Sequence, residues 1–236
     1  TESHRMLRDS VRKFIAREIA PFIDQWEEAG RFPLELYRKA GDAGFLGLGY
    51  PEEYGGTPAD IFHQVAYTEE IMRSGSSGLA SGLGCSAIAV PPILALGTEM
   101  QKRNYVPPVL AGEQVAVLAV TEPSGGSDVA NLLTRATRRG DKFIVNGGKT
   151  FITSGTRADY CTTAVRTGGP GHAGISLLII ERDTPGFTVS KKLHKMGWLA
   201  SDTAELSFAD CEVPAENLLG EENKGFYGCL LYTSDA

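Results

Sequence analysis

Residues 118–129 read LAVTEPSGGSDV and are the most informative stretch of this chain. They follow directly from an apolar run at 115–120, and Pro123 then starts a turn rich in Gly and Ser. A short apolar run bounded by turn residues is typical of a buried strand that ends in a loop. Thr121 stands at the end of that strand, where its hydroxyl could form a hydrogen bond with a planar heterocycle.

The turn itself has the composition of an anion site. Gly125 and Gly126 allow backbone N–H groups to approach an anion closely, and Ser127 adds a hydroxyl donor. Taken by its spacing alone, the same segment also fits a plain Ser/Gly turn capped by Asp128. Both interpretations stay open at this point.

A second segment, KTFITSG at 149–155, also reads as a strand that ends in hydroxyls. The aromatic side chain of Phe151 beside Thr153 suits a flat ring system, with one face on the aromatic ring and one edge on hydroxyl and N–H groups. The alternative is an ordinary strand residue, because Phe is common in strands.

The surrounding sequence from residue 113 onward predicts an all-β block, a barrel or a sandwich. Asn146-Gly147 tolerates the positive φ of a type I′ turn and predicts a hairpin, with a bulge at Gly148. Further short apolar runs bounded by turn residues predict strands at 115–120, 143–145, 150–152, 160–167, 175–180, 187–190 and 204–209.

Residues 1–112 predict an all-α block instead. Apolar residues recur at helical spacing at Leu7, Val11, Phe14, Ile15 and Ile19, and again at Ile61, Val65, Thr68 and Met72. Between them, Pro21 ends the first helix, Pro33 suits a helix N1 position, and Gly44 suits a helix C′ position. The uncharged segment 74–98 is long enough to span a bilayer, but its glycines and its Pro91-Pro92 pair favour a buried, helix-rich core.

Composition excludes several function classes. The chain has 236 residues, a net charge of −6 and a pI near 5.3, which argues against nucleic acid as the main partner. None of the four cysteines forms a C-x-x-C pair and only four histidines accompany them, so we expect no metal site. No G-x-G-x-x-G motif opens a helix after a strand, which argues against a Rossmann domain. Reduced cysteines are the expectation.

The two segments together form the pattern T-E-P-x-x-G-S-D followed by F/W-I-T-x-G, which resembles the acyl-CoA dehydrogenase family strongly. The stretches KLHKMGWLASDT (192–203), VPAENLLGEENKGF (213–226), GFLG (44–47) and PEEYGG (51–56) are similar to that family too. Ser124 departs from the usual Gly of the turn, and Phe151 replaces the commoner Trp. The resemblance covers residues 1 to about 226.

The resemblance implies an N-terminal α-helical domain at 1–112, a β middle domain at 113–226 and a C-terminal helical bundle that is absent from this chain. FAD binds between the middle and C-terminal domains. The octapeptide CLLYTSDA at 229–236 resembles a translated transposase sequencing adapter, so we expect residues 227–236 to be a non-native tail on a truncated gene.

The resemblance also implies the site. Thr121 would contact the isoalloxazine edge, Gly126 and Ser127 would approach the pyrophosphate, and Thr153 would lie near flavin N5. The cofactor-binding set is Leu118, Ala119, Val120, Thr121, Gly125, Gly126, Ser127, Phe151, Ile152 and Thr153. The acyl-CoA set is Ser127, Thr167 and His172.

The implied reaction is α,β-dehydrogenation of an acyl-CoA to the trans-2-enoyl-CoA in fatty acid β-oxidation, with hydride transfer to FAD. A carboxylate with a raised pKa must take the α-proton. In the family that carboxylate is a Glu of the C-terminal domain. Glu122 belongs to the loop motif and is not assigned as this base, so we expect no catalytic residue in this chain and no activity without the missing domain.

Alternatives and partners follow from the same resemblance. An acyl-CoA oxidase or flavin monooxygenase of the same fold remains open, as does a non-catalytic flavin or acyl-CoA binding module. The implied partners are an electron-transferring flavoprotein and further copies of the chain in a homotetramer or dimer. The implied location is the cytoplasm of a bacterium or the mitochondrial matrix. We expect the chain alone to bind FAD poorly.

Overall fold

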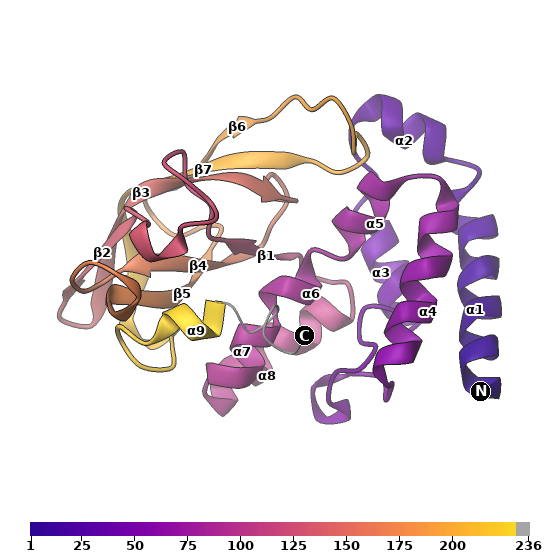
Figure 1. Cartoon of the computed structure of the whole chain (residues 1–236), viewed down its shortest axis with the longest axis horizontal. Helices are drawn as coiled ribbons and strands as arrows, with labels where there is room; N and C mark the ends of the chain where they lie inside the picture. The colour runs from indigo at the N-terminus through magenta and orange to yellow at the C-terminus, as the bar shows by residue number, and fades with distance from the viewer. Residues whose placement is uncertain (230–236) are drawn as a thin grey trace. The chain divides into compact units, whose positions relative to one another are not determined.

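The computed structural model describes residues 1–229, which form two compact units (Figure 1). The first unit contains residues Thr1–Gly84, Pro107–Gln114 and His194–Asp202, and the second contains Cys85–Val106, Val115–Leu193 and the chain from Thr203 onward. The expected adapter-derived segment lies outside the described residues, except for residue 229. The predicted fold class, a helical N-terminal region followed by a β-sheet domain, is confirmed.

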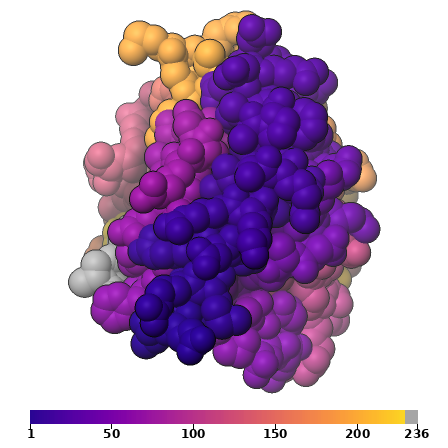
Figure 2. All heavy atoms as spheres, turned by 90° about the vertical axis from the view of Figure 1, so that its right-hand side faces the viewer, coloured from indigo at the N-terminus to yellow at the C-terminus, as the bar shows by residue number. Residues whose placement is uncertain are grey.

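The first unit is built from helices. They are α1 (Glu2–Phe14), which continues as the π-helix η1 (Ile15–Ile19), then α2 (Ile23–Ala29), α3 (Glu35–Asp42), α4 (Ile61–Ile71) and α5 (Ser77–Leu83), with short 3-10 turns η2 (Glu52–Tyr54) and η3 (Met72–Ser74). Figure 2 shows the surface that the N-terminal helices present to solvent. The predicted stripe on α1 and η1 is the buried face, because Val11, Phe14, Ile15 and Ile19 are all buried. Pro21 follows the end of this helical run, as predicted.

The sequence predicted one end of helix α3 correctly and the other end wrongly. Gly44 follows the C-cap residue Ala43 and has φ of +76°, so the C′ prediction is confirmed. The N1 prediction for Pro33 is wrong, because α3 begins at Glu35 with Leu34 as its N-cap. Proline fixes its own φ but does not fix where the first helical hydrogen bond forms.

Helix α4 exists as predicted, but its buried face is a different one. Ile61, Val65 and Met72 are exposed, and the buried side carries Ala66, Glu70 and Ile71. Glu70 is buried because Arg12 and Arg8 of α1 donate hydrogen bonds to its carboxylate, at 2.8–2.9 Å. A charged residue can occupy a core position when its charge is paired, which the apolar pattern cannot reveal.

The uncharged segment forms buried helices, as predicted. Leu79 and Leu83 of α5 are buried in the first unit, and Ala89, Val90 and Ile93 are buried in the second. No single helix within residues 1–229 is long and apolar enough to cross a membrane, although Ser77–Leu83 and Ser86–Leu96 satisfy the length and composition test when taken together.

The second unit holds the sheet. Its strands are β1 (Ala116–Ala119), β2 (Arg135–Arg139), β3 (Lys142–Thr153), β4 (Tyr160–Arg166), β5 (Ile175–Glu181), β6 (Phe187–Lys192), β7 (Thr203–Pro214) and β8 (Leu218–Leu219). Their order is β6-β7-β3-β2-β4-β5-β8, and β1 pairs in parallel with β4. The sheet is mixed, because β2 also meets β4 in parallel while the other pairs are antiparallel.

The helices α6 (Ser86–Ala89), α7 (Pro91–Leu96) and α9 (Gly225–Cys229) belong to this unit, and α8 (Glu99–Leu110) starts in it.

The predicted hairpin at Asn146-Gly147 is wrong. Strand β3 runs through both residues, and the turn that reverses the chain lies at Gly140-Asp141, between β2 and β3. Asn146 and Gly147 instead lie at a register shift against β7, where Gly147 has φ of +145°. Pairing with two neighbouring strands overrides the local turn preference. The charged strand β2, RATRR, has one buried residue and escaped the apolar pattern.

Candidate functional site

A pocket opens where β1 and β3 end beside α6. Its volume is about 170 Å³. It is lined by Cys85, Ile88, Leu118, Val120, Thr121, Phe151, Ile152 and Thr153. The last six belong to the predicted cofactor-binding set, so the fold brings together residues from both sequence segments.

The end of β3 has an unusual backbone that shapes this pocket. The register of β3 against β7 shifts between Lys149 and Ile152, and Phe151 has φ of +60°. Positive φ is uncommon for a residue with a Cβ and costs free energy. The result is that Ile152 stays buried while Phe151 is 67% exposed and its ring lies in the pocket wall.

The turn after β1 is closed by its own backbone. Glu122 and Gly125 exchange two N–H···O=C hydrogen bonds of 3.0 Å. A Cβ on Gly126 would lie 3.2–3.3 Å from the Thr121 side chain, whereas a Cβ on Gly125 would meet nothing within 4 Å. Of the two glycines, only Gly126 has a neighbour that an added Cβ would crowd. Within residues 1–229, the N–H groups of Gly126 and Ser127 have no protein acceptor, and both residues are exposed.

A buried ion pair lies behind the turn. Lys149 Nζ lies 2.8 Å from Glu122 Oε1, and the Glu122 carboxylate also accepts the N–H groups of Leu133 at 2.5 Å and Thr134 at 2.9 Å. Burial by itself would raise the pKa of Glu122, but the charge and hydrogen bond of Lys149, together with these N–H donors, outweigh it and lower that pKa. Glu122 is therefore a carboxylate anion with a structural role.

The sequence motif predicts a structural Glu122 but gives no sign of its partner. Lys149 is fully buried on strand β3. The signal that could have found it is the position of Lys149 directly before the predicted strand at 150–152, because a lysine in a strand core needs a partner for its charge. Cys85 and Ile88, which also line the pocket, carried no such signal.

Six predicted residues do not line the pocket: Gly125, Gly126 and Ser127 lie in the adjoining turn, and Ala119, Thr167 and His172 lie elsewhere. Ala119 is completely buried and faces the core, because it alternates with Leu118 and Val120 along the strand. Thr167 and His172 lie on the connection from β4 to β5. The Thr167 hydroxyl is 2.5 Å from Ser176 Oγ and 2.8 Å from Asn223 Oδ1. The His172 ring centroid is 5.7 Å from that of Phe226.

Arg166, which the sequence reasoning did not single out, links this connection to the chain that follows Ser127. Its guanidinium donates to four carbonyl oxygens: those of Ala130 at 2.7 Å and Leu132 at 3.0 Å on one side, and those of Gly169 at 2.5 Å and Gly171 at 3.2 Å on the other. Because one side chain joins both loops, the segments with Ser127 and His172 are held side by side.

The arrangement fits part of a flavin cofactor. The pocket offers an apolar wall, an outward aromatic ring and the hydroxyls of Thr121 and Thr153, while the adjoining turn offers unpaired N–H groups. The pocket is smaller than the roughly 300–1,000 Å³ of complete small-molecule sites. The described residues therefore suit a planar ring and a phosphate group but do not enclose a whole FAD.

Comparison with known proteins agrees with this geometry. The family model for the N-terminal domain of acyl-CoA dehydrogenases matches residues 1–113, and the model for the middle domain matches residues 117–211. The mitochondrial long-chain specific acyl-CoA dehydrogenase of Rattus norvegicus is 42% identical, over 96% of this chain and 53% of that protein.

Two solved structures are similar over 98% of this chain. A probable acyl-CoA dehydrogenase from Mycobacterium abscessus is 52% identical with a TM-score of 0.95, and 61% of it is covered. An acyl-CoA dehydrogenase from Bacillus anthracis, solved in complex with FAD, is 33% identical with a TM-score of 0.90, and 40% of it is covered. The chain thus spans only part of the length of the proteins it matches. Its sequence, its fold and both domain models agree, and the chain belongs to the acyl-CoA dehydrogenase family.

Proposed function

We propose that this chain supplies the flavin-binding part of an oxidoreductase that converts an acyl-CoA to the trans-2-enoyl-CoA. The observation that carries the proposal is the pocket in which Thr121, at the end of β1, meets Phe151 and Thr153, at the end of β3. The proposed domains are residues 1–112 and 113–226.

The pocket residues would hold the isoalloxazine ring of FAD. The apolar wall and Phe151 would take the faces of the ring, and the hydroxyls of Thr121 and Thr153 would be available as hydrogen-bond partners for its edge. The N–H groups of Gly126 and Ser127, which have no acceptor within residues 1–229, would donate to the pyrophosphate. Bound FAD supplies the hydride acceptor for the β-hydrogen of the substrate. Support for FAD comes from the fit of these groups and from the FAD complex of the Bacillus anthracis relative.

The loop pair joined by Arg166 is the proposed contact for the CoA portion. Ser127 is exposed beside the flavin turn, and His172 is exposed on the neighbouring loop. The Thr167 hydroxyl is already bonded to Ser176 and Asn223, so its proposed role is to shape the loop rather than to bind CoA directly.

The base that removes the proton from the substrate α-carbon is proposed to lie outside this chain. A base for this step needs a raised pKa, and the pKa of Glu122 is lowered by Lys149. The pocket lining contains no carboxylate. The residues of this chain therefore bind and orient the reactants and leave proton abstraction to another part of the enzyme.

The proposed electron acceptor is an electron-transferring flavoprotein, and the proposed assembly is a homotetramer or dimer. A location in a bacterial cytoplasm or the mitochondrial matrix is part of the same proposal. The acceptor distinguishes the proposal from an acyl-CoA oxidase or a flavin monooxygenase, which would use oxygen.

The test uses the product of the complete gene that encodes this chain. We expect a bound flavin that is bleached by acyl-CoA without oxygen, and electron transfer to an electron-transferring flavoprotein that is faster than to oxygen. Thr153→Val, which removes the hydroxyl and keeps the shape, should lower the bleaching rate. A flavin that no acyl-CoA reduces would refute the proposed reaction, and rapid peroxide formation would assign the oxidase instead.

A further inference from the structure

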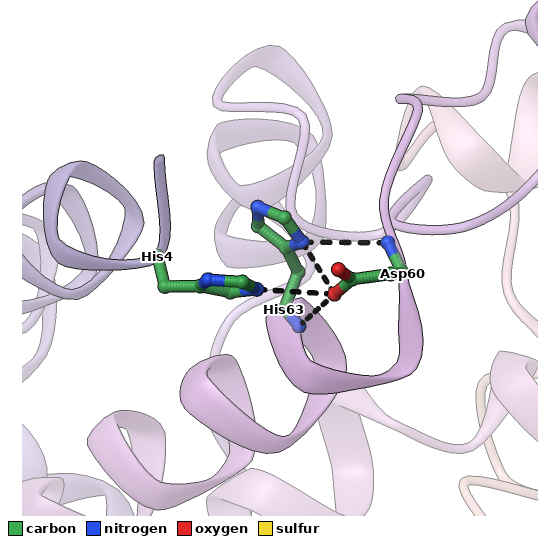
Figure 3. A group of neighbouring side chains, drawn as sticks. All are labelled: His4, Asp60 and His63. Atoms are coloured by element: carbon green, nitrogen blue, oxygen red, sulfur yellow. Dashed lines mark hydrogen bonds and ion pairs between the residues drawn. The ribbon is translucent and has the colours of Figure 1, made fainter. Parts of the chain in front are cut away.

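His4, Asp60 and His63 form a cluster on the first unit, with His4 on α1 and the other two at the start of α4 (Figure 3). His4 Nε2 lies 3.1 Å and His63 Nδ1 lies 2.7 Å from the same oxygen, Asp60 Oδ1. One ligand atom from each residue lies within 4.8 Å of the others. The three side chains therefore converge on one point although 56 positions separate His4 from Asp60.

The inner ring nitrogen of His63 has two close neighbours on Asp60. The Asp60 N–H lies 3.3 Å from His63 Nδ1 in the capping box of α4, and Asp60 Oδ1 lies 2.7 Å from the same nitrogen. Either a proton on Nδ1 or a metal ion can bridge this nitrogen and the carboxylate oxygen.

The outer ring nitrogens of both histidines have partners. His63 Nε2 lies 3.2 Å from Ser3 Oγ, and His4 Nδ1 lies 2.6 Å from Thr1 Oγ1. His4 Nδ1 also accepts from the Thr1 amino group at 3.2 Å, so coordination through His4 Nε2 requires the ring proton to move from Nε2 to Nδ1. Metal-bound histidines commonly have such a partner on the other ring nitrogen.

Charge and access agree with this arrangement. Asp60 brings a carboxylate oxygen to the point where the two imidazole nitrogens meet. The Asp60 side chain is 54% exposed, so water can reach the point of convergence. Two imidazole nitrogens, one carboxylate oxygen and one water make a four-coordinate set suited to Zn²⁺, with ligand distances of about 2.0–2.2 Å.

We propose that His4, Asp60 and His63 bind one Zn²⁺ ion, which joins the first turn of α1 to the start of α4. In a tetrahedral site the ligand atoms stand about 3.3 Å apart, and the three ligand atoms here all lie within 4.8 Å of one another, so Zn²⁺ would draw them into place by side-chain adjustment. The cysteine and histidine pattern of the sequence predicts no metal site, and His4 lies far from Asp60 and His63 in the chain.

The first experiment measures zinc affinity. The purified, EDTA-treated full chain is titrated with zinc chloride against a chromophoric chelator. We expect one Zn²⁺ per chain with a dissociation constant in the micromolar range. Asp60→Asn keeps an N-cap acceptor for the His63 N–H, which lies 2.9 Å from Asp60 Oδ1, but removes the charge, and it should weaken binding at least tenfold. His4→Gln and His63→Gln should weaken it as much.

The matched control is His194→Gln, since His194 is an exposed histidine of the same unit outside the cluster. It should bind Zn²⁺ like the unchanged chain. Equal affinity in His63→Gln and the unchanged chain would overturn the proposal, and so would binding too weak to compete with the chelator. Circular dichroism of each variant checks that its helices are intact, so a lost site is not confused with unfolding.

Two further measurements locate the ion. Zn²⁺ should raise the melting temperature of the unchanged chain and leave that of Asp60→Asn unchanged, because a ligand stabilises only a fold that binds it. Co²⁺ in place of Zn²⁺ should show absorption bands of nitrogen and oxygen ligands. A thiolate charge-transfer band would place the ion on cysteine and refute the site, although burial raises the pKa of Cys161 to about 12 and that of Cys211 to about 11.

Discussion

Lys149 Nζ lies 2.8 Å from Glu122 Oε1 and 2.9 Å from the Val120 carbonyl oxygen, and both charged side chains are buried. The neighbouring Thr150 N–H donates to the Thr121 carbonyl at 2.9 Å. Strand β3 is thereby tied to the end of β1 at the residues that lead into the proposed flavin turn. The pair therefore controls where Thr121 stands relative to Thr153.

Replacing one member of this ion pair should lower the unfolding free energy more than replacing both. Lys149→Met leaves the Glu122 carboxylate buried without its counter-charge, and we expect a loss of about 3–5 kcal/mol in unfolding free energy. Lys149→Met combined with Glu122→Gln should recover a large part of it, because the double variant buries no unpaired charge. Urea unfolding measures both. Strict additivity of the two single changes would show that the pair is not coupled.

Acid should destabilise the helical unit through Glu70. Hydrogen bonds and charge from Arg12, then Arg8, outweigh burial and lower the pKa of Glu70 to about 2. A group with a depressed folded pKa stabilises the fold above its unfolded pKa, near 4.5, and this contribution is lost as the pH falls toward about 2.

The measurement is the unfolding free energy between pH 7 and pH 2. The Glu70→Gln variant should be less stable at pH 7. Below pH 5 its unfolding free energy should depend less on pH, because its amide does not titrate. Glu28→Gln is a control at an exposed carboxylate of the same unit. A slope below pH 5 that Glu70→Gln leaves intact would assign the acid sensitivity to other carboxylates.

The two glycines of the flavin turn should respond differently to alanine. A Cβ at Gly126 would lie 3.2 Å from the Thr121 side chain, so Gly126→Ala should displace Thr121 and weaken FAD binding by the complete gene product several-fold. Gly125→Ala has open space and should bind FAD normally. Fluorescence quenching of FAD measures both. Equal effects would mean that the turn, rather than the contact with Thr121, sets the affinity.

Phe151 and Ile152 offer a contrast between ligand binding and stability. Phe151 is 67% exposed, so Phe151→Ala should change the unfolding free energy by no more than about 0.5 kcal/mol while weakening FAD binding. Ile152 is 3% exposed, so Ile152→Ala should cost about 2–5 kcal/mol. Phe151→Trp should retain FAD. Normal FAD affinity in Phe151→Ala would exclude the proposed stacking role.

The chain by itself should bind FAD poorly. Its pocket of about 170 Å³ takes only part of the cofactor. The purified chain should therefore lack the visible spectrum of a stoichiometric flavin, even after incubation with excess FAD and gel filtration. A yellow protein with one FAD per chain would contradict this expectation.

Local patterns predicted most elements but not their partners. The stripe from Val11 to Ile19 has a helical period, and that period reported the buried face correctly because only apolar groups fill it. On α4 the same logic chose the wrong face, because the buried position belongs to Glu70 and its partners lie on another helix. Likewise, Asn146-Gly147 has a strong turn preference, but the strands on both sides extend β3 through it.

The candidate site divides in the same way. The segments around Thr121 and Thr153 were found from their own residues and from their resemblance to a family, and the structure brings them into one pocket. The roles of Lys149 and Arg166 were not predicted. Each depends on hydrogen-bond acceptors that other segments of the chain supply. The placement of Thr167 and His172 away from the pocket was also not evident.

By itself, the sequence determined the helical and sheet regions, the motif-bearing loops and the family. These depend on period, turn chemistry and short motifs, which are properties of neighbouring residues. Only the tertiary structure decided which charges are buried together, where β3 bulges, and that His4 meets Asp60 and His63. Such contacts join residues far apart in the chain, and their free energy depends on distance and burial that no local pattern records.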